Sequence, residues 1–420
     1  MRTLIKNIKG LVGVETTTRS LAVCGKAMNE LAIVENAFLI SNNGVFEAFG
    51  QMSEMPDGQF DLTVDANERF VLPSFCDSHT HIVFKGSREI EYLDKINGLS
   101  YEQIAERGGG ILNSAKRLRE ASEIDLYNEA MKRVNEMMDY GTGAIEVKSG
   151  YGLSLDSELK MLRVIKELRK NCTVAIKATF LGAHAVPNEY IGRADDYVDE
   201  IVKRMLPAIA RENLADYVDV FCDRGFFTVE QTERILFAAM GFGIVPKIHA
   251  NELDNSGGVQ VGVKYNALSV DHLEFISTDE INSLMSSQTM PTILPGAAFF
   301  LNMRKSPARE MIAAGLPVAM ASDFNPGSSP SGNMQLVLSM ACVDYKLTPA
   351  QAINATTLNT AYAMGISETH GSIAVGKTAN YYITSKIPTI EYLPYYYGTN
   401  KVWRHFVKGI EHLKTLDDGF

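Results

Sequence analysis

The sequence predicts an α/β fold, a TIM-like (β/α)8 barrel with a small β-sandwich module built from both ends of the chain. Between residues 70 and 345, short apolar runs alternate with amphipathic helical stretches. This alternation indicates parallel strands joined by crossover helices, and eight strand candidates fit a closed barrel. The 420 residues exceed the ~250 of such a barrel by enough for an added module. Alternation by itself leaves a doubly wound open sheet as the other arrangement.

The two ends of the chain carry a different pattern. The first 68 residues show short strand-like runs broken by turn residues, and Asn42-Asn43-Gly44 is a strong hairpin signal. After Gly371 the sequence becomes strand-like again. We therefore expect residues 1–68 and 366–420 to form one discontinuous β module, and residues 69–365 to form the catalytic barrel.

The barrel elements follow from hydrophobic periodicity and capping signals. The strands are expected to begin near Val71, Ala144, Val174, Tyr217, Ile244, Ala267, Pro291 and Pro317. The helices between them are expected over Asp125–Asp139, Ser157–Lys170, Ala194–Glu212, Thr228–Met240 and Asp279–Ser286. Thr228 with Gln231, and Ser277 with Glu280, fit capping boxes at helix starts. Pro349 follows Thr348 at the first position of another helix.

The composition is that of an acidic globular protein with a large core. Hydrophobic residues make up 46% of the chain, and the formal net charge is -10. This charge argues against a nucleic-acid surface and against a basic membrane patch. No apolar stretch approaches the ~20 residues of a membrane helix, and the first residues lack the apolar segment of a secretory signal. We expect a cytoplasmic protein that acts on a small molecule and binds neither nucleic acid nor membrane.

Histidines gather at the expected strand ends. Alternate residues of a strand point the same way, so the two imidazoles of His79-Thr80-His81 are aimed at one point. The carboxyl ends of barrel strands converge on one face. Five of the eight histidines fall there: His79, His81, His184, His249 and His272.

Three of these histidines, together with Asp323 at the end of the eighth expected strand, make a metal-ligand set. His79, His81, His249 and Asp323 offer three nitrogens and one oxygen, which suits one Zn²⁺, with Fe²⁺ as the alternative, and leaves a position for water. For Asp323 the other reading is a helix cap or turn residue. It is also a candidate proton acceptor in catalysis.

Two further strand-end residues are candidates for catalysis. Glu252 follows His249 by three positions and could relay a proton between water and a substrate ring nitrogen. Its other reading is a solvated loop glutamate. His272 could polarise a carbonyl, or it could be a structural histidine bonded to backbone.

Loop residues on the same face are candidates for binding substrate. Arg88 could hold a carboxylate bidentately, although a surface ion pair with Glu89 or Glu91 would also explain it. Tyr151 lies on a glycine-rich loop as a hydroxyl donor or a packed aromatic. The polar groups after the eighth strand could grip a ligand: Asn325, Gly327 and Ser328.

A phosphate-loop pattern near the C-terminus is misleading. Residues 371–378 match GxxxxGK[ST], but the residues that follow them read as a strand. A phosphate loop opens a helix. We therefore do not expect nucleotide binding.

These residues together resemble the amidohydrolase superfamily. His79, His81, His249, His272 and Asp323 occur in its barrel order, and residues 371–383 are similar to its return into a β module. The fourth strand, Val218–Phe221, lacks the bridging lysine of the binuclear members, which implies one metal.

A narrower set of motifs resembles the imidazolonepropionases, and the resemblance covers nearly the whole chain. The motifs are His79–Phe84 with Arg88, Glu146–Gly152, Phe180–His184, His249–Glu252 and Ser322–Gly327. The resemblance implies hydrolysis of 4-imidazolone-5-propanoate to N-formimidoyl-L-glutamate in histidine degradation, and a homodimer. Arg88 would then bind the propanoate, while Tyr151, His184 and Glu252 would contact the ring. Ser74, Lys85 and Asn380 depart from the family pattern, and Lys85 could alter substrate fit.

Two other readings of this site remain open. A cyclic amidine deaminase or amidohydrolase acting on another carboxylate-bearing ring would use the same residues. A metal-free relative with an assembly role would be expected to lack intact ligands.

Overall fold

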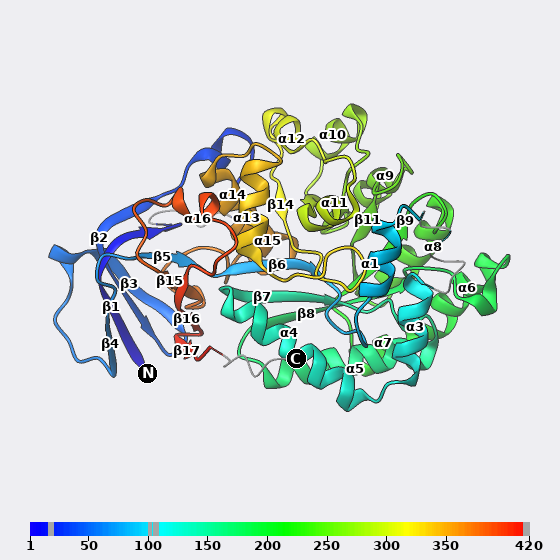
Figure 1. Ribbon diagram of the computed structural model, residues 1–420, viewed down its shortest axis with the longest axis horizontal. Helices are drawn as coiled ribbons and strands as arrows, with labels where there is room; N and C mark the ends of the chain where they lie inside the picture. The colour runs from blue at the N-terminus through cyan, green and yellow to red at the C-terminus, as the bar shows by residue number, and fades with distance from the viewer. Residues whose placement is uncertain (16–20, 100–102, 104–108, 415–420) are drawn as a thin grey trace.

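A computed structural model describes residues 1–15, 21–99, 103 and 109–414 of the chain. Two sheets organise these residues, one in the barrel and one formed by segments from both chain ends (Figure 1). The predicted fold class is confirmed. The second sheet lies to one side of the barrel, next to its first strands (Figure 1).

The barrel sheet is parallel along its whole path. Its strands follow the chain in order, so each crossover helix joins neighbouring strands. They are β6 (Phe75–Thr80), β7 (Thr142–Lys148), β8 (Ala175–Ala183), β9 (Tyr217–Cys222), β11 (Ile248–Ala250), β12 (Ser269–His272), β13 (Met290–Ile293) and β14 (Ala319–Met320), with the short β10 (Val245–Pro246) beside β9.

Helices surround this sheet (Figure 1). They are α1 (Glu89–Ile96), α3 (Ile111–Glu120), α4 (Glu123–Asp139), α5 (Leu155–Asn171), α6 (Ala194–Glu200), α7 (Leu206–Glu212), α8 (Val229–Met240), α9 (Gly258–Lys264), α10 (Thr278–Met285), α11 (Pro295–Leu301), α12 (Ala308–Ala314), α13 (Met334–Val343), α14 (Pro349–Thr356), α15 (Leu358–Ala363) and α16 (Tyr392–Tyr395). The capping boxes predicted at Thr228 and Ser277 are both formed, and Thr348 makes a third.

The first expected barrel strand proves to be two strands. The apolar run near Val71 is β5 (Phe70–Pro73), which pairs with strands of the second sheet. The barrel begins after Ser74, at Phe75, whose backbone N–H donates to Gly141 at 3.0 Å. Both runs are buried, so apolar character could not show which sheet each one joins.

The helix expected over Ala194–Glu212 is interrupted. A π-helical turn, Ile201–Met205, separates α6 from α7. Pro207 has no N–H for the carbonyl four residues earlier, and such a gap favours a local widening of the helix.

The second sheet combines segments from both ends of the chain. Its path runs from the C-terminal strands through β5 to the N-terminal hairpin, and β4 pairs with β1 off this path. The strands are β1 (Arg2–Val12), β2 (Ile33–Asn42), β3 (Val45–Gln51), β4 (Leu62–Asp65), β5, β15 (Tyr381–Thr384), β16 (Val402–Val407) and β17 (Ile410–His412). The residues after the GxxxxGKT pattern form β15, so the pattern does not open a helix.

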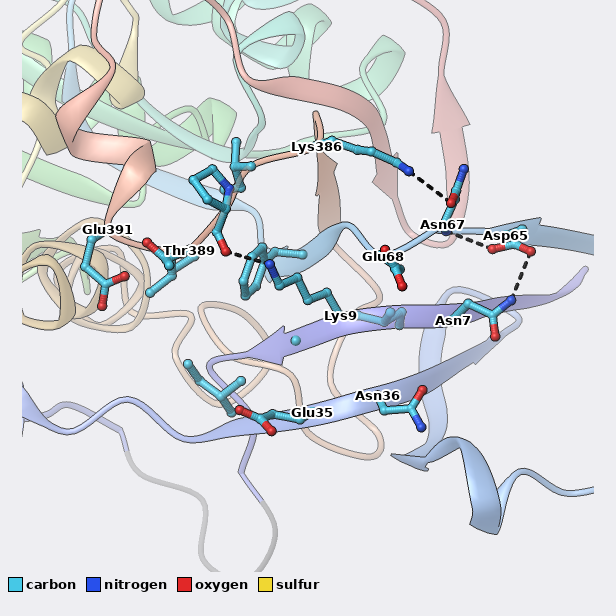
Figure 2. A pocket seen from close by; sticks show the side chains of 17 residues that line it. Asn7, Lys9, Glu35, Asn36, Asp65, Asn67, Glu68, Lys386, Thr389 and Glu391 are labelled. Carbon is cyan, nitrogen blue, oxygen red and sulfur yellow. Dashed lines mark hydrogen bonds between the residues drawn. The ribbon is translucent and has the colours of Figure 1, made fainter.

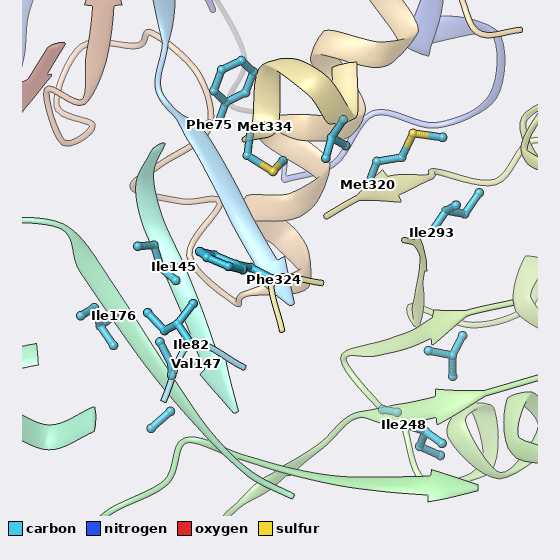
Figure 3. Close-up of a cluster of buried hydrophobic side chains, with 14 of the residues drawn as sticks. Phe75, Ile82, Ile145, Val147, Ile176, Ile248, Ile293, Met320, Phe324 and Met334 are labelled. Carbon is cyan, nitrogen blue, oxygen red and sulfur yellow. The ribbon is translucent and has the colours of Figure 1, made fainter. Parts of the chain in front are cut away.

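Apolar and charged side chains alternate along the barrel strands. Ile145 and Val147 of β7 lie in the buried apolar cluster (Figure 3). Glu146 and Lys148 alternate with them on the opposite face of the strand. Glu146 forms an ion pair with Lys247, just before β11, which is not adjacent to β7. These charged groups therefore meet across the barrel interior.

A surface cavity of about 1280 Å³ lies in the second sheet rather than over the barrel. Figure 2 shows Lys9 and Lys386 among its lining residues, with Lys386 donating to Asn67 at 3.1 Å. None of its lining residues belongs to the histidine cluster.

No helix among the described residues combines the length and apolar character needed to cross a membrane.

Candidate active site

Three histidines from two barrel strands meet at the carboxyl end of the sheet. His79 is in β6, His81 follows that strand, and His249 is in β11. One ring nitrogen from each lies within 4.8 Å of the other two, and all three side chains are buried. Oδ1 of Asp323 lies 3.5 Å from Nε2 of His79 and 3.5 Å from Nε2 of His81. This set of three imidazoles and one carboxyl group fits a divalent metal ion.

Barrel closure brings Asp323 to the histidines. The backbone N–H of Asp323 donates to the carbonyl of His79 at 3.0 Å, and the N–H of His81 donates to the carbonyl of Phe324 at 2.8 Å. Asp323 has φ of 55°, a left-handed conformation that costs free energy for a residue with a side chain. The contacts between the first strand and the residues after the last one hold that conformation in place.

Carboxylates behind two of the histidines set their orientation. Nδ1 of His79 lies 2.6 Å from Oδ2 of Asp271, and Nδ1 of His249 lies 2.9 Å from Oδ2 of Asp219. With Nδ1 facing a carboxylate, Nε2 of each ring is left for the metal. Burial, followed by the positive charge of Lys148, lowers the pKa of His79 well below its usual range, so the ring is neutral as a ligand must be.

Glu252 and His272 form an adjacent pair. Oε2 of Glu252 lies 3.6 Å from Nε2 of His272, and both side chains are buried. Burial, together with the nearby carboxylates of Asp323 and Asp223, raises the pKa of Glu252 to about 8. Burial also raises the pKa of Asp323, to about 7. Both carboxyl groups can therefore take up and release a proton near neutral pH.

Tyr151 and His184 lie beside the cluster of His79, His81 and His249. The His184 ring stacks on that of His81 with centroids 5.3 Å apart, and the Tyr151 ring is 5.4 Å from His184. Burial, followed by the charge of His249, lowers the pKa of His184 to about 3. Nδ1 of this neutral ring donates to the carbonyl of Gly150 at 3.0 Å, which leaves Nε2 as a hydrogen-bond acceptor.

Glu158 holds the loop that carries Tyr151. Its buried carboxylate accepts hydrogen bonds from the backbone N–H groups of Gly150, Gly152 and Leu153 at 3.2, 2.8 and 2.9 Å. From the other side, Arg119 donates to the carbonyls of Gly152 and Leu153 at 3.0 and 2.9 Å. The loop is thus fixed by both its donors and its acceptors.

Arg88 forms an ion pair with Glu91, through Nε at 2.7 Å and Nη2 at 2.6 Å. This is one of the two ion pairs that the sequence offered as an alternative to substrate binding. The pair does not remove Arg88 from the site. Its Nη1 lies only 2.1 Å from the position that a Cβ atom at Gly327 would occupy. Glycine at this position is therefore required for the guanidinium to lie against the loop after Asp323.

The polar groups of that loop bond mainly to one another. Oδ1 of Asn325 accepts from the backbone N–H groups of Gly327 and Ser328, both at 2.8 Å. Its Nδ2 donates to the carbonyl of Asp323 at 2.7 Å. Asn325 thus shapes the loop, and the binding role predicted for it with Gly327 and Ser328 stays a prediction.

The sequence pattern did not predict a functional role for several residues at this site. Asp219 and Asp271 lie inside runs that read as apolar strands, and Glu158 lies inside a helical pattern. Lys148 lies within the motif Glu146–Gly152, which by itself gives the lysine no separate role. Among the departures from the family pattern, Lys85 pairs with Glu129 of α4 at 2.6 Å. Ser74 Oγ lies 2.9 Å from Nε2 of His405, at the joint between the two sheets.

Comparisons with known proteins identify the family. The imidazolonepropionase of Flavobacterium johnsoniae is 54% identical over 402 residues, covering 96% of this chain and 98% of the relative. The chain belongs to the imidazolonepropionase family. The imidazolonepropionase of Christiangramia forsetii is 51% identical over 409 residues, covering 97% and 99% of the two chains. The model of the amidohydrolase family matches residues 248–392.

Solved structures of other proteins share the fold of this member of the imidazolonepropionase family. A triazine hydrolase variant has a TM-score of 0.75 at 14% identity and covers 98% of this chain and 94% of its own. An adenosine deaminase from Xanthomonas campestris with bound zinc has a TM-score of 0.71 at 15% identity and covers 99% and 94%. At these identities the likeness shows the fold alone. The family and the histidine cluster together indicate a divalent metal.

Proposed function

We propose that this chain hydrolyses 4-imidazolone-5-propanoate to N-formimidoyl-L-glutamate, in histidine degradation, with one Zn²⁺ held by His79, His81, His249 and Asp323. The observation that carries the proposal is the convergence of this ligand set beside the Glu252–His272 pair, in a chain of this family. Fe²⁺ is the alternative ion. A cytoplasmic location and a homodimer stay predictions.

The chemistry adds water across one ring bond. The bond between the ring carbonyl carbon and its nitrogen breaks, the carbon gains the water oxygen, and the nitrogen gains one of the water protons. The carboxylic acid so formed releases the second proton to solvent and becomes a carboxylate. A divalent metal bound at the ligand set would supply Lewis-acid polarisation and a water of lowered pKa. The protein's own titratable groups can carry the proton that moves from the water to the ring nitrogen.

Glu252 is the group we assign to that transfer, because its raised pKa allows it to accept a proton from water and return it to the ring nitrogen. His272 lies against Glu252 and faces the developing oxyanion in this assignment. Asp323 is a second proton acceptor. Arg88 binds the propanoate, and Nε2 of His184 accepts a hydrogen bond from a ring N–H, with Tyr151 beside it.

The test is turnover of freshly generated 4-imidazolone-5-propanoate, followed by the loss of its ultraviolet absorbance with spontaneous decay subtracted. We expect rapid loss with N-formimidoyl-L-glutamate as product, abolished by His249→Ala. Absence of acceleration by the zinc-loaded protein would refute the proposal. Release of ammonia from a cyclic amidine would instead favour a deaminase.

A further inference from the structure

Five buried charged side chains form a layer inside the barrel, deeper than the metal ligands. Lys148 and Lys247 supply two positive charges, and Glu146, Asp219 and Asp271 supply three carboxylates. All five are fully inaccessible to solvent, at 0% exposure. Burial of this many charges is costly unless each one is paired and hydrogen-bonded, so the arrangement calls for a specific reason.

Lys148 contacts both of the carboxylates that face the metal histidines. Its Nζ donates to Oδ2 of Asp219 at 2.8 Å and lies 3.7 Å from Oδ2 of Asp271. These are the same two oxygen atoms that approach the imidazoles. Asp219 Oδ2 lies 2.9 Å from Nδ1 of His249, and Asp271 Oδ2 lies 2.6 Å from Nδ1 of His79. One ammonium group thus lies behind two metal ligands that come from separate strands.

Glu146 fixes Lys148 in turn. Its Oε1 accepts from Lys148 Nζ at 2.7 Å and from the hydroxyl of Thr179 at 2.7 Å. Its Oε2 pairs with Lys247, which also donates to the backbone carbonyls of Ser78 at 3.1 Å and Ala363 at 3.2 Å. Lys148 is therefore tied to the barrel wall and cannot follow a carboxylate that moves.

We propose that Lys148 is a positioning residue of the metal site, a role that rests on the metal-dependent function proposed above. It holds Asp219 and Asp271 in place, and these carboxylates orient the rings of His249 and His79 toward the ion. The burial of the charged layer is explained by this role, because a flexible or solvated lysine could not fix two carboxylates at once. Carboxylates that hydrogen-bond to ligand histidines strengthen metal binding, and loss of such a carboxylate typically lowers metal affinity by about 10–100-fold.

The first measurement is zinc affinity of the purified full-length protein, determined by competition with a chromophoric chelator and without reference to activity. Lys148→Met is expected to weaken zinc binding by about 10–100-fold. The matched control is Lys177→Met, which removes another barrel-strand lysine with an ion pair, to Asp216 at 3.5 Å, but leaves the charged layer intact. The control is expected to bind zinc as the parent protein does.

A double-mutant cycle separates positioning from simple structural support. If Lys148 acts through Asp219, the combined Lys148→Met and Asp219→Asn variant loses less affinity than the two single losses added together. Should Lys148→Met fail to fold, Glu146→Gln provides the second variant, since it keeps the shape and weakens the hold on Lys148. It is then expected to weaken zinc binding as well.

The outcomes distinguish this inference from the function on which it rests. A parent protein that binds no zinc would refute the proposed metal site itself. A parent protein that binds zinc, with Lys148→Met binding it equally well, would refute the positioning role and leave the proposed function standing. Strictly additive losses in the cycle would also overturn the role.

Discussion

Replacing Glu252 by glutamine should stabilise the metal-free protein, and the gain should grow with pH. Burial raises the pKa of this carboxyl from its ordinary 4.5 to about 8. Between those pH values the folded protein binds a proton that the unfolded chain has already released, so the free energy of unfolding falls as pH rises. Above pH 8 both states are ionised, and the cost stays constant. Glutamine carries no charge and avoids this cost.

The magnitude follows from the two pKa values. Each pKa difference of one is worth about 1.4 kcal/mol. Linkage then gives a gain for Glu252→Gln of about 1 kcal/mol at pH 5, about 3 kcal/mol at pH 7 and roughly 4–5 kcal/mol above pH 8. The same residue should be required for turnover, so the variant would exchange activity for stability.

Urea unfolding at pH 5, 7 and 9, with chelator present, measures this gain. Glu120→Gln, at an exposed position on α3, is the control and should change the free energy of unfolding by less than about 0.5 kcal/mol at every pH. A gain for Glu252→Gln that is absent, or equal at all three pH values, would refute the reasoning. Full turnover by this variant would separately remove Glu252 from proton transfer.

Three further predictions concern substrate binding. Arg88→Ala should raise KM by about 10–100-fold with a smaller effect on kcat, because a charge-assisted pair is worth ~1.5–3 kcal/mol, and an unchanged KM in steady-state kinetics would exclude Arg88 from the pocket. Gly327→Ala should raise KM in the same assay, since its Cβ would overlap Nη1 of Arg88, and retention of the parent KM would show that the guanidinium lies elsewhere. Glu158→Gln should raise KM and leave zinc content unchanged, because an amide cannot accept from three backbone N–H groups as the carboxylate does. Zinc loss without a KM change would contradict the role we give to Glu158.

The strand-end histidines could be predicted because their geometry is local. The spacing of His79 and His81 fixes that both rings point the same way, whatever the rest of the fold does. Parallel strands then bring His249 and Asp323 to the same end of the sheet. The capping boxes at Thr228 and Ser277 are local in the same sense, because each needs only residues three positions apart.

The carboxylates behind the histidines could not be predicted in this way. Asp219 lies in the run Val218–Phe221, where its neighbours suggest an ordinary apolar strand. Its pairing with His249 depends on the register between β9 and β11, and that register is fixed by packing over the whole barrel. The sequence nonetheless contained a signal for buried, paired charges in the barrel. Glu146 and Lys148 alternate with Ile145 and Val147 in a strand buried on both faces, so one face had to contain paired charges.

The excess of buried acid explains why the charged layer and the metal site belong together. Near the ligands, burial and neighbouring carboxylates raise the pKa values of Glu252 and Glu274 above their usual range. Neither oxygen of Glu274 has a hydrogen-bond partner in the described part of the chain. A divalent cation bound beside these carboxyl groups would favour their ionised forms and lower the cost of burying them. Lys148 cannot substitute for that cation, because its ammonium group is already committed to the carboxylates beneath the histidines.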